Sequence, residues 1–399
     1  MSCAPHHLYT QAEWHDPHIA FARIHALSAL AGSAFEILRP VFGRHAVERP
    51  MPAALDGPSP GDIAALRAHY ADVNRSHASA SPSYWVRIRS AVVWRNMIFV
   101  EAGGDTIPLY ETFRIIDRQE RGGTVAEELK GHAILDFDSG GADVIFYGSV
   151  GSFNYGHWLV DDFPRYAVLA EAERPPLCLF SSFDPAIDRI RQEGAALAAG
   201  PQACACRFVD RDIPLRVRDL LYVTPCSEHP FVKNPQALAY LRDLGQRAAP
   251  AAASGRRLFV NRGERWPRRL SNFADLAPVL RDHGFEEIVT DDLSLREQIA
   301  AFAGAGIVAG IMGAGMTNTV FSPPGTPLLC LAPSGWAEPF FWDAAAACGQ
   351  PYHALFGVPD ADDPRPLHQK SFSVDPQALA AMLERLTTER DRAPLTLRR

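Results

Sequence analysis

The chain has 399 residues, of which 47% are hydrophobic and 21% are charged, values typical of a globular protein large enough for two domains. Its net charge of −7 gives no bulk attraction to nucleic acid or to an anionic membrane, and seven cysteines are too few for a disulfide scaffold. The amino terminus has no basic segment followed by an apolar run, and no apolar run is long enough to span a bilayer. We therefore expect a cytoplasmic protein with reduced cysteines and no transmembrane segment, which a partner could hold at the inner membrane.

The first half of the chain changes from irregular to β-rich and then to alternating strands and helices. Residues 1–80 are rich in Ala, Pro and His and are expected to form an irregular extension. In residues 84–110, β-branched and aromatic residues are interrupted by Arg95-Asn96 and by "GGD" at 103–105, which predicts an antiparallel meander. Beyond it the sequence predicts strands at 143–148, 176–182, 207–209 and 219–224, and helices at 155–173, 185–198 and 235–248.

The second half alternates more regularly, after a small, proline-containing stretch at 249–255 that is the best candidate for a linker. Ser294 and Glu297 have the spacing of a capping box, which predicts that a helix begins there. The sequence predicts strands at 257–261, 286–289, 307–311 and 327–332, and helices at 273–284, 294–305, 315–321, 338–348 and 375–387. The predicted fold class is therefore α/β, with two Rossmann-like halves and a ligand cleft between them at the carboxyl ends of the strands.

A glycine loop follows the predicted strand 307–311. The stretch "GIMGAGMTN" has the order strand, glycine turn, helix that presents backbone N–H groups to phosphate. It belongs to the third βα unit of its half, and strand 327–332 ends without the acidic residue that binds a ribose, so an NAD site is disfavoured. A pyrophosphate cradle and a plain structural turn are both left open, since Gly313 and Gly315 would permit close backbone approach in either case.

A basic segment follows strand 257–261 directly, at the same carboxyl edge of the predicted sheet. It reads "NRGERWPRRLSN" and supplies guanidinium groups that match phosphate oxygens, from Arg262, Arg265, Arg268 and Arg269. The alternative is a solvated basic loop. Because two neighbouring loops of one sheet supply arginines and N–H groups together, an anionic diphosphate ligand is favoured.

The segment "NYGHWLVDDFPR", residues 154–165, places His157 and Asp161 four residues apart, and therefore on one face of a helix near its first turn. A carboxylate there could deprotonate a hydroxyl group, and the histidine could orient that group or bind a phosphate. Spacing alone favours the alternative, a helix turn with solvated acids and a core histidine.

Three further patterns carry less weight. "DFD" at 136–138 has the form of a metal-dependent sugar transferase motif, but short acidic turns are common and no metal site is expected there. Cys204 and Cys206 lack the two-residue spacer of zinc knuckles, and no second pair follows them. The chain has no P-loop, H-E-x-x-H or G-x-S-x-G motif, which disfavours NTPases and hydrolases.

Three of these segments together resemble glycosyltransferase family 61, a group that includes bacterial capsular-polysaccharide proteins, plant xylan arabinosyl- and xylosyltransferases and animal O-GlcNAc transferases. They are "NYGHWLVDDFPR", "NRGERWPRRLSN" and "MGAGMTNTVFSPPGT", and "LSLREQIAAFAGA" resembles the helix before the family's glycine loop. The likeness spans residues 90–335. The resemblance implies a GT-B fold, with two Rossmann-like domains facing a cleft and a small β-rich amino-terminal part.

The resemblance also implies a division into domains and a role for each. Residues 1–250 would form the acceptor-side domain and residues 256–370 the domain that binds the nucleotide sugar. Residues 371–399 would form a helix and tail that pack back on the amino-terminal domain.

The resemblance further implies roles for single residues. Asp161 would be the general base, with His157 on the acceptor side of the cleft. The other implied substrate-binding positions are Asn154, Arg262, one of Arg268 or Arg269, Met312, Gly313, Ala314, Gly315 and Asn318. Met312 departs from the family's pattern, because a histidine usually stands before "GAG" and a thioether replaces that hydrogen-bond donor here.

We therefore expect an inverting, metal-independent hexosyl- or pentosyltransferase of surface-polysaccharide or glycoconjugate assembly that needs no cofactor. Its partners would be a nucleotide diphosphate sugar as donor and a hydroxyl group of a glycan, lipid-linked or protein acceptor; a homodimer is left open. The alternatives are a non-catalytic nucleotide-sugar-binding protein, another enzyme of similar fold such as an epimerase, and an NAD-dependent oxidoreductase.

Overall fold

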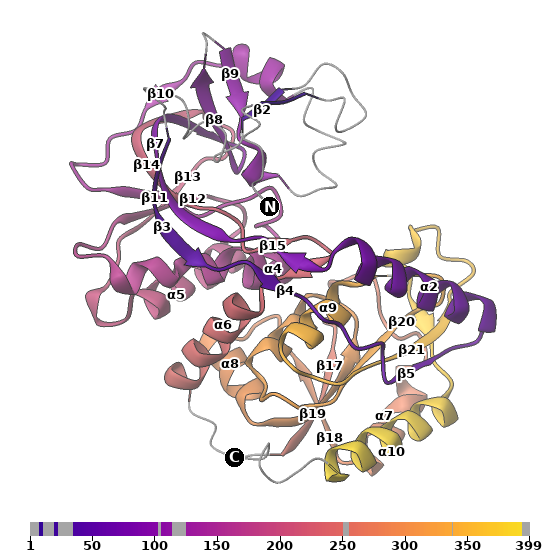
Figure 1. Cartoon of the computed structure of the whole chain (residues 1–399). Helices are drawn as coiled ribbons and strands as arrows, with labels where there is room; N and C mark the ends of the chain where they lie inside the picture. The colour runs from indigo at the N-terminus through magenta and orange to yellow at the C-terminus, as the bar shows by residue number, and fades with distance from the viewer. Residues whose placement is uncertain are drawn as a thin grey trace. The chain divides into compact units, whose positions relative to one another are not determined.

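The computed structural model describes residues 8–10, 20–22, 35–102, 105–113, 125–249, 255–336 and 338–392 (Figure 1). These residues form two compact units. Unit 1 contains the described residues up to Arg44 and Ser81–His229, and unit 2 contains His45–Ala80 and the described residues from Pro230 onward. The division differs from the expected domains, because residues 45–80 and the segment after His229 both belong with the carboxyl-terminal part of the chain.

Unit 1 is built on a mixed sheet whose parallel strands were predicted in the right places. Its parallel part has the order β13 (Cys206–Val209), β12 (Leu177–Ser181), β11 (Val144–Phe146), β14 (Leu215–Val223), and β10 (Leu135–Asp136) also pairs with β14. Helix α5 (Pro185–Ala199) connects β12 to β13. It begins as its sequence predicts, since the Asp184 side chain accepts hydrogen bonds from the N–H groups of Ala186 and Ile187.

The antiparallel meander predicted for residues 84–110 is confirmed. It consists of β7 (Ser83–Trp94), β8 (Met97–Ala102) and β9 (Asp105–Pro108), and β7 also pairs with β14 and with β3 (Phe35–Phe42). Arg95 and Asn96 have φ values of 47° and 68°, the positive values that a two-residue type I′ turn requires. Gly103 and Gly104 of the predicted second turn lie outside the described residues. The short strands β1 (Leu8–Thr10) and β2 (Ala20–Ala22) pair with each other, and η2 (Tyr110–Thr112), a helical turn at 125–130 and β15 (Ser227–Glu228) complete the unit.

Unit 2 contains the second parallel sheet. Its order is β18 (Phe285–Val289), β17 (Arg256–Asn261), β19 (Ala305–Ile311), β20 (Leu328–Pro333), β21 (Tyr352–Pro359), with β22 (Phe372–Ser373) antiparallel and β5 (Ala54–Asp56) parallel to β21. Its remaining elements are α6 (Pro235–Ala248), α7 (Phe273–Asp282), α8 (Leu295–Ala303), η6 (Ala314–Phe321), α9 (Phe340–Ala347), η7 (Leu367–Gln369), β16 (Val232–Lys233) and the pair β4 (His45–Ala46) and β6 (Ser79–Ala80). The capping box of Ser294 and Glu297 is present at α8. The linker predicted at 249–255 lies mostly outside the described residues.

Two parts of unit 2 differ from the expectations. Helix α10 (Pro376–Arg392) packs against α7, β19 and β21, so the carboxyl-terminal helix is part of this unit, whereas we expected it to pack on the amino-terminal domain (Figure 1). Helix α2 (Pro60–Ser76) lies in the stretch that was expected to be irregular. Its apolar face is small, with only Leu66, Tyr70 and Val73 buried among its apolar residues, which explains why its periodicity is weak in the sequence.

Each unit has a core of its own. In unit 1 an apolar cluster joins β7, β8, β11 and β14, and in unit 2 another joins the central strands of the sheet to α7 and α10. Among the helices that the structure describes, none is both long and apolar enough to cross a membrane.

Candidate active site

The segment predicted as a helix over 155–173 is helical over 155–171, but its pitch changes twice. It begins with one α-turn, α4 (Tyr155–His157), widens into the π-helical turn η3 (Trp158–Asp162) and tightens into the 3-10 helix η4 (Phe163–Glu171). Asn154 begins the segment, because its side-chain oxygen accepts the N–H of Gly156 at 2.9 Å. Such π-turns are rare and occur often at functional sites, since they turn neighbouring side chains in new directions.

The structure brings the predicted pair His157 and Asp161 together. The Nδ1 atom of His157 lies 3.6 Å from Oδ2 of Asp161, and the Asp161 side chain is only 10% exposed. Ser227 donates a hydrogen bond to Oδ1 of the same carboxylate. The ring of His229 lies 4.1 Å from the ring of His157 and perpendicular to it. We call these four residues the carboxylate site.

Ser227 and His229 were missed by the sequence reading, although the topology explains their position. They follow β14, which runs parallel to β11, and β11 precedes the segment that carries Asp161. Loops that follow parallel neighbouring strands meet at the carboxyl edge of the sheet. The motif "CSEH" directly after the predicted strand 219–224 was the signal that could have identified them.

A small pocket opens beside the carboxylate site. It has a volume of about 50 Å³. Most of the residues that line it have polar or charged side chains; they are Glu111, Phe113, Ser149, Asp161, Asp162, Arg165, Pro225, Ser227, Glu228 and His229. A volume of this size admits a hydroxyl-sized group or ordered water next to Asp161.

The neighbouring acid, Asp162, points to a different set of partners. Its two oxygens accept hydrogen bonds from Arg165 at 2.8 Å and from Ser152 at 2.5 Å. Arg165 is fully buried, and its guanidinium carbon lies 4.6 Å from the centre of the Tyr222 ring. Burial raises the pKa of the Asp162 carboxyl, while Arg165 and Ser152 act against the rise. Asp162 is therefore held in a buried ion pair with Arg165, whereas the partners of Asp161 are Ser227 and His157.

His157, Asp161 and His229 also form a group that could hold a metal ion. Their ligand atoms all lie within 4.8 Å of one another, and two imidazoles with one carboxylate suit a divalent transition metal. The "DFD" motif is arranged differently, because Asp138 closes a turn by accepting the N–H of Gly140 at 2.8 Å. The carboxylate site thus permits two kinds of chemistry, proton abstraction by Asp161 or coordination of a cation.

In unit 2, the structure brings the predicted arginine segment and the glycine loop together. Strands β17 and β19 are parallel neighbours, so the segments that follow them lie at one edge of the sheet. The backbone of Gly313 is extended, and a Cβ atom there would collide with the guanidinium of Arg262. The Arg262 side chain therefore lies directly against the backbone of the loop, where only a glycine leaves room for it.

Arg268 reaches the same loop from the other end of the arginine segment. Its Nε donates to the carbonyl oxygen of Met312 at 3.0 Å, a second nitrogen donates to the carbonyl of His368, and the guanidinium carbon lies 4.3 Å from the centre of the Trp336 ring. Burial lowers the pKa of Arg268, and the positive charge of Arg262 lowers it further. Burial lowers the pKa of Arg262 as well. The carboxylate of Asp291 acts against this effect at Arg262, and an anion close to both guanidinium groups would favour their charged forms further.

We call Arg262, Arg268 and the backbone of Gly313, Ala314 and Gly315 the diphosphate site, after the ligand that the sequence predicts for these segments. Helix η6 begins at Ala314, and the first N–H groups of a helix have no partner within it, so they are available to a phosphate. Gly315 is close to the Thr290 hydroxyl, which a Cβ atom would approach to 2.8 Å.

The other predicted residues of this region have side chains that are buried, paired with other residues or exposed. The Met312 side chain is fully buried, so the residue takes part through its carbonyl group alone. Asn318 is also fully buried and donates to Gln298 at 2.8 Å and to the Gly315 carbonyl at 3.1 Å, which ties η6 to α8. Arg269 is exposed, and Arg265 lies 3.3 Å from Asp291. Of the pair Arg268 and Arg269, the structure brings Arg268 to the loop.

Comparison with known proteins gives one finding. Residues 155–329 match the model of the family described as Glycosyltransferase 61, a range that includes Asp161, the arginine segment and the glycine loop. No curated protein matches the chain.

Proposed function

We propose that the chain, which matches the model of glycosyltransferase family 61 over residues 155–329, transfers a sugar from a nucleotide diphosphate sugar to a hydroxyl group, with inversion at the anomeric carbon. The observation that carries the proposal is the diphosphate site. The buried guanidinium of Arg268 and the half-buried guanidinium of Arg262 meet a glycine backbone and the start of a helix there, and two positive charges favour a ligand with more than one negative charge.

We assign the general base to Asp161. In an inverting step the acceptor oxygen attacks the anomeric carbon and its proton passes to the base, while the bond to the diphosphate breaks and the diphosphate leaves with the electron pair. Asp161 suits this role because its carboxylate borders the pocket and is oriented by Ser227 and His157. The pocket beside it would receive the acceptor hydroxyl.

The same proposal explains how the charge on the leaving group would be stabilised. Arg262, Arg268 and the N–H groups at the start of η6 would bind the diphosphate oxygens, so the reaction would not need a metal ion. Arginine side chains fixed before the reaction supply such stabilisation without rearrangement.

We place the protein in surface-polysaccharide or glycoconjugate assembly, as a hexosyl- or pentosyltransferase of bacterial capsular type with a GT-B arrangement. A cytoplasmic location fits the free cysteines Cys178, Cys204, Cys206, Cys226, Cys330 and Cys348. The acceptor would carry its hydroxyl group on a glycan, a lipid-linked sugar or a protein.

The test combines donor binding with single-residue variants. A thermal-shift panel of nucleotide sugars, nucleoside diphosphates and NAD identifies the donor, and transfer is then measured with that donor in the presence and absence of EDTA. We expect Asp161→Asn to bind the donor with unchanged affinity and to lose transfer by at least about 100-fold, the scale of general-base catalysis.

Asp184→Asn is the matched control, because Asp184 caps α5 in the same unit, outside both the pocket and the carboxylate site, and asparagine caps a helix equally well. It should retain transfer. Stabilisation by NAD alone would refute the transferase assignment, and full activity of Asp161→Asn would refute the choice of base. Loss of transfer with EDTA would assign His157, Asp161 and His229 to a metal ion instead.

A further inference from the structure

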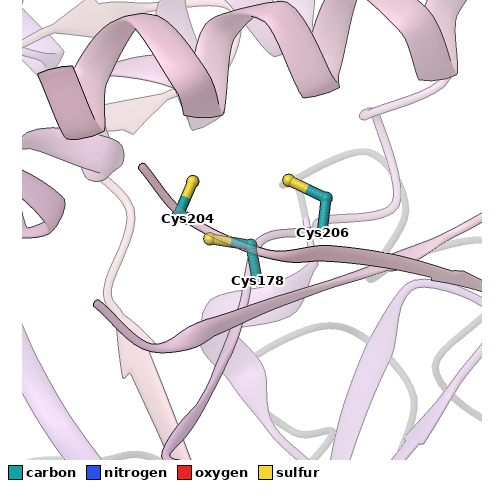
Figure 2. Close-up of side chains that lie close together, drawn as sticks. All are labelled: Cys178, Cys204 and Cys206. Carbon is teal, nitrogen blue, oxygen red and sulfur yellow. The ribbon is translucent and has the colours of Figure 1, made fainter. Parts of the chain in front are cut away.

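Three cysteines of unit 1 lie together although they come from two strands. Cys178 belongs to β12, Cys206 begins β13, and Cys204 precedes β13 by two residues (Figure 2). Their sulfur atoms all lie within 4.8 Å of one another, and none of the three is in a disulfide. The sequence pattern C-x-C gave no reason to expect a third cysteine beside it, because Cys178 lies 26 residues before Cys204.

The pairing of the two strands fixes this arrangement. In the parallel ladder Cys178 is the partner of Cys206, and the N–H of Cys178 donates to the carbonyl of Ala205 at 2.8 Å. Cys178 therefore lies between Cys204 and Cys206. Residues two apart in extended chain point to the same side, which places both sulfur atoms of the C-x-C pair on the side where Cys178 lies.

The next pair along the same face holds the strands in place. Phe180 is the partner of Phe208, and their rings stack with centres 4.9 Å apart. The guanidinium of Arg191 covers both rings, at 4.8 Å and 5.8 Å from their centres. Because Phe180 and Arg191 are buried and Phe208 is half-buried, the spacing of the cysteines one step away is set by the fold rather than by chance contacts of mobile side chains.

The burial of the three sulfur-bearing residues differs in a way that suits a ligand. Cys178 is completely buried, whereas Cys204 and Cys206 are partly exposed, so the group has a closed base and an open side. The other described cysteines, Cys226, Cys330 and Cys348, are each buried and belong to no such group among the described residues.

We propose that Cys178, Cys204 and Cys206 form a binding site for a soft, thiol-seeking cation of the Zn²⁺ type. Three thiolates are the hallmark of soft-metal sites, and a cation with four ligands would keep its last position for water or a small external thiol. Since that position faces the open side, the cation exchanges with solvent and is not a closed structural centre. This site is independent of sugar transfer and does not rest on the proposed function.

The test is a metal titration of the full chain, kept reduced with a phosphine and first stripped with a chelator. Cd²⁺ serves as the probe, because its bonds to thiolates give a charge-transfer absorption in the ultraviolet. A second titration starts from the Zn²⁺-loaded chain, because Cd²⁺ is the softer cation and should replace Zn²⁺ at thiolates. We expect one Cd²⁺ per chain and the same final absorption in both titrations. The variants Cys204→Ala and Cys206→Ala should each lose the absorption.

Cys348→Ala is the matched control, since it removes a buried cysteine of unit 2 and should keep the signal. Cys204 and Cys206 carry the test because they are partly exposed, so their replacement leaves the core intact, whereas loss of Cys178 could disturb folding. The proposal is overturned if the wild-type chain shows no stoichiometric absorption. It is also overturned if both exposed variants bind Cd²⁺ as the wild type does, or if Cys348→Ala loses the signal equally.

Discussion

Replacing Gly313 by alanine tests the diphosphate site most directly. The backbone at Gly313 has φ 174° and ψ 175°, an extended conformation that any residue adopts, so alanine brings no backbone strain. The new Cβ atom would instead occupy the space of the Arg262 guanidinium. Because that group is the end of a flexible side chain, it can move away at little cost, and the protein should fold normally. The change therefore displaces one cation and leaves the rest of the site in place.

The expected size of the effect follows from the interaction that is lost. A hydrogen bond that involves a charged group contributes about 1.5–3 kcal/mol, which corresponds to about a 10- to 150-fold rise in the dissociation constant of a diphosphate. The free energy of unfolding should change by less than about 0.5 kcal/mol, as for a substitution outside the core. Calorimetric titration with inorganic pyrophosphate, and with the nucleoside diphosphate that stabilises the wild type most, measures the first quantity. Urea unfolding measures the second.

Gly61→Ala serves as the control for this experiment. Gly61 lies in the first turn of α2, and a Cβ atom there would meet nothing closer than the Ser59 hydroxyl at 3.9 Å. It should leave binding unchanged. If Gly313→Ala folds and binds pyrophosphate as tightly as the wild type, Arg262 does not hold the ligand, and the glycine is explained by packing alone.

Two further predictions concern stability. Asp343 is fully buried and accepts hydrogen bonds from Arg49 at 2.5 Å and from the backbone N–H of Lys233 at 2.8 Å. Asp343→Ala would leave two buried cations without their carboxylate, so it should cost about 3–5 kcal/mol of unfolding free energy in urea. A cost below about 1 kcal/mol would contradict this expectation. Burial lowers the pKa of His353 below its ordinary value of 6.5, and Glu389 acts against this effect. The neutral ring therefore stabilises the fold above pH 6.5, and this contribution is lost as the pH falls through 6.5 towards the folded-state pKa. His353→Gln should reduce this pH dependence, by at most about 1.4 kcal/mol per pH unit, and equal slopes of unfolding free energy between about pH 7 and pH 5 would exclude the histidine as its source.

The sequence predicted those features that depend on local pattern. Turn chemistry predicted the meander turn at Arg95-Asn96, and helix capping predicted the start of α8 at Ser294 and Glu297. Apolar runs predicted the parallel strands that β11 and β12 form in unit 1 and β17, β19 and β20 form in unit 2. The proximity of His157 to Asp161 followed from helical spacing, and the meeting of the arginine segment with the glycine loop followed from the edge rule for parallel strands.

What the sequence could not predict depends on contacts between distant parts of the chain. Asp161 and Asp162 have different partners, Ser227 for the first and Ser152 with Arg165 for the second, and nothing in "VDDF" indicates which acid meets which. Helix α2 was missed because few of its residues are apolar and buried, so it shows no clear helical periodicity. It is held in place by a distant contact, the stacking of Tyr70 on Trp342 with ring centres 4.4 Å apart. Cys178 lies beside Cys204 and Cys206 because of the pairing of β12 with β13. Met312 contacts Arg268 through its backbone carbonyl, a contact that does not depend on the identity of its side chain.

The division of the chain has a consequence for how such proteins can be recombined. The sequence enters unit 2 after Arg44, returns to unit 1 after Ala80 and enters unit 2 again after His229. Residues 45–80 form part of the structure of unit 2, because β5 extends its sheet at β21 and Arg49 pairs with the buried carboxylate of Asp343. A chimaera that exchanges everything after a single crossover near residue 230 would therefore separate a sheet from its edge strand and a buried carboxylate from its arginine. To exchange unit 2 between relatives as an intact module, residues 45–80 must be transferred together with the segment after His229, as a second, matched insert.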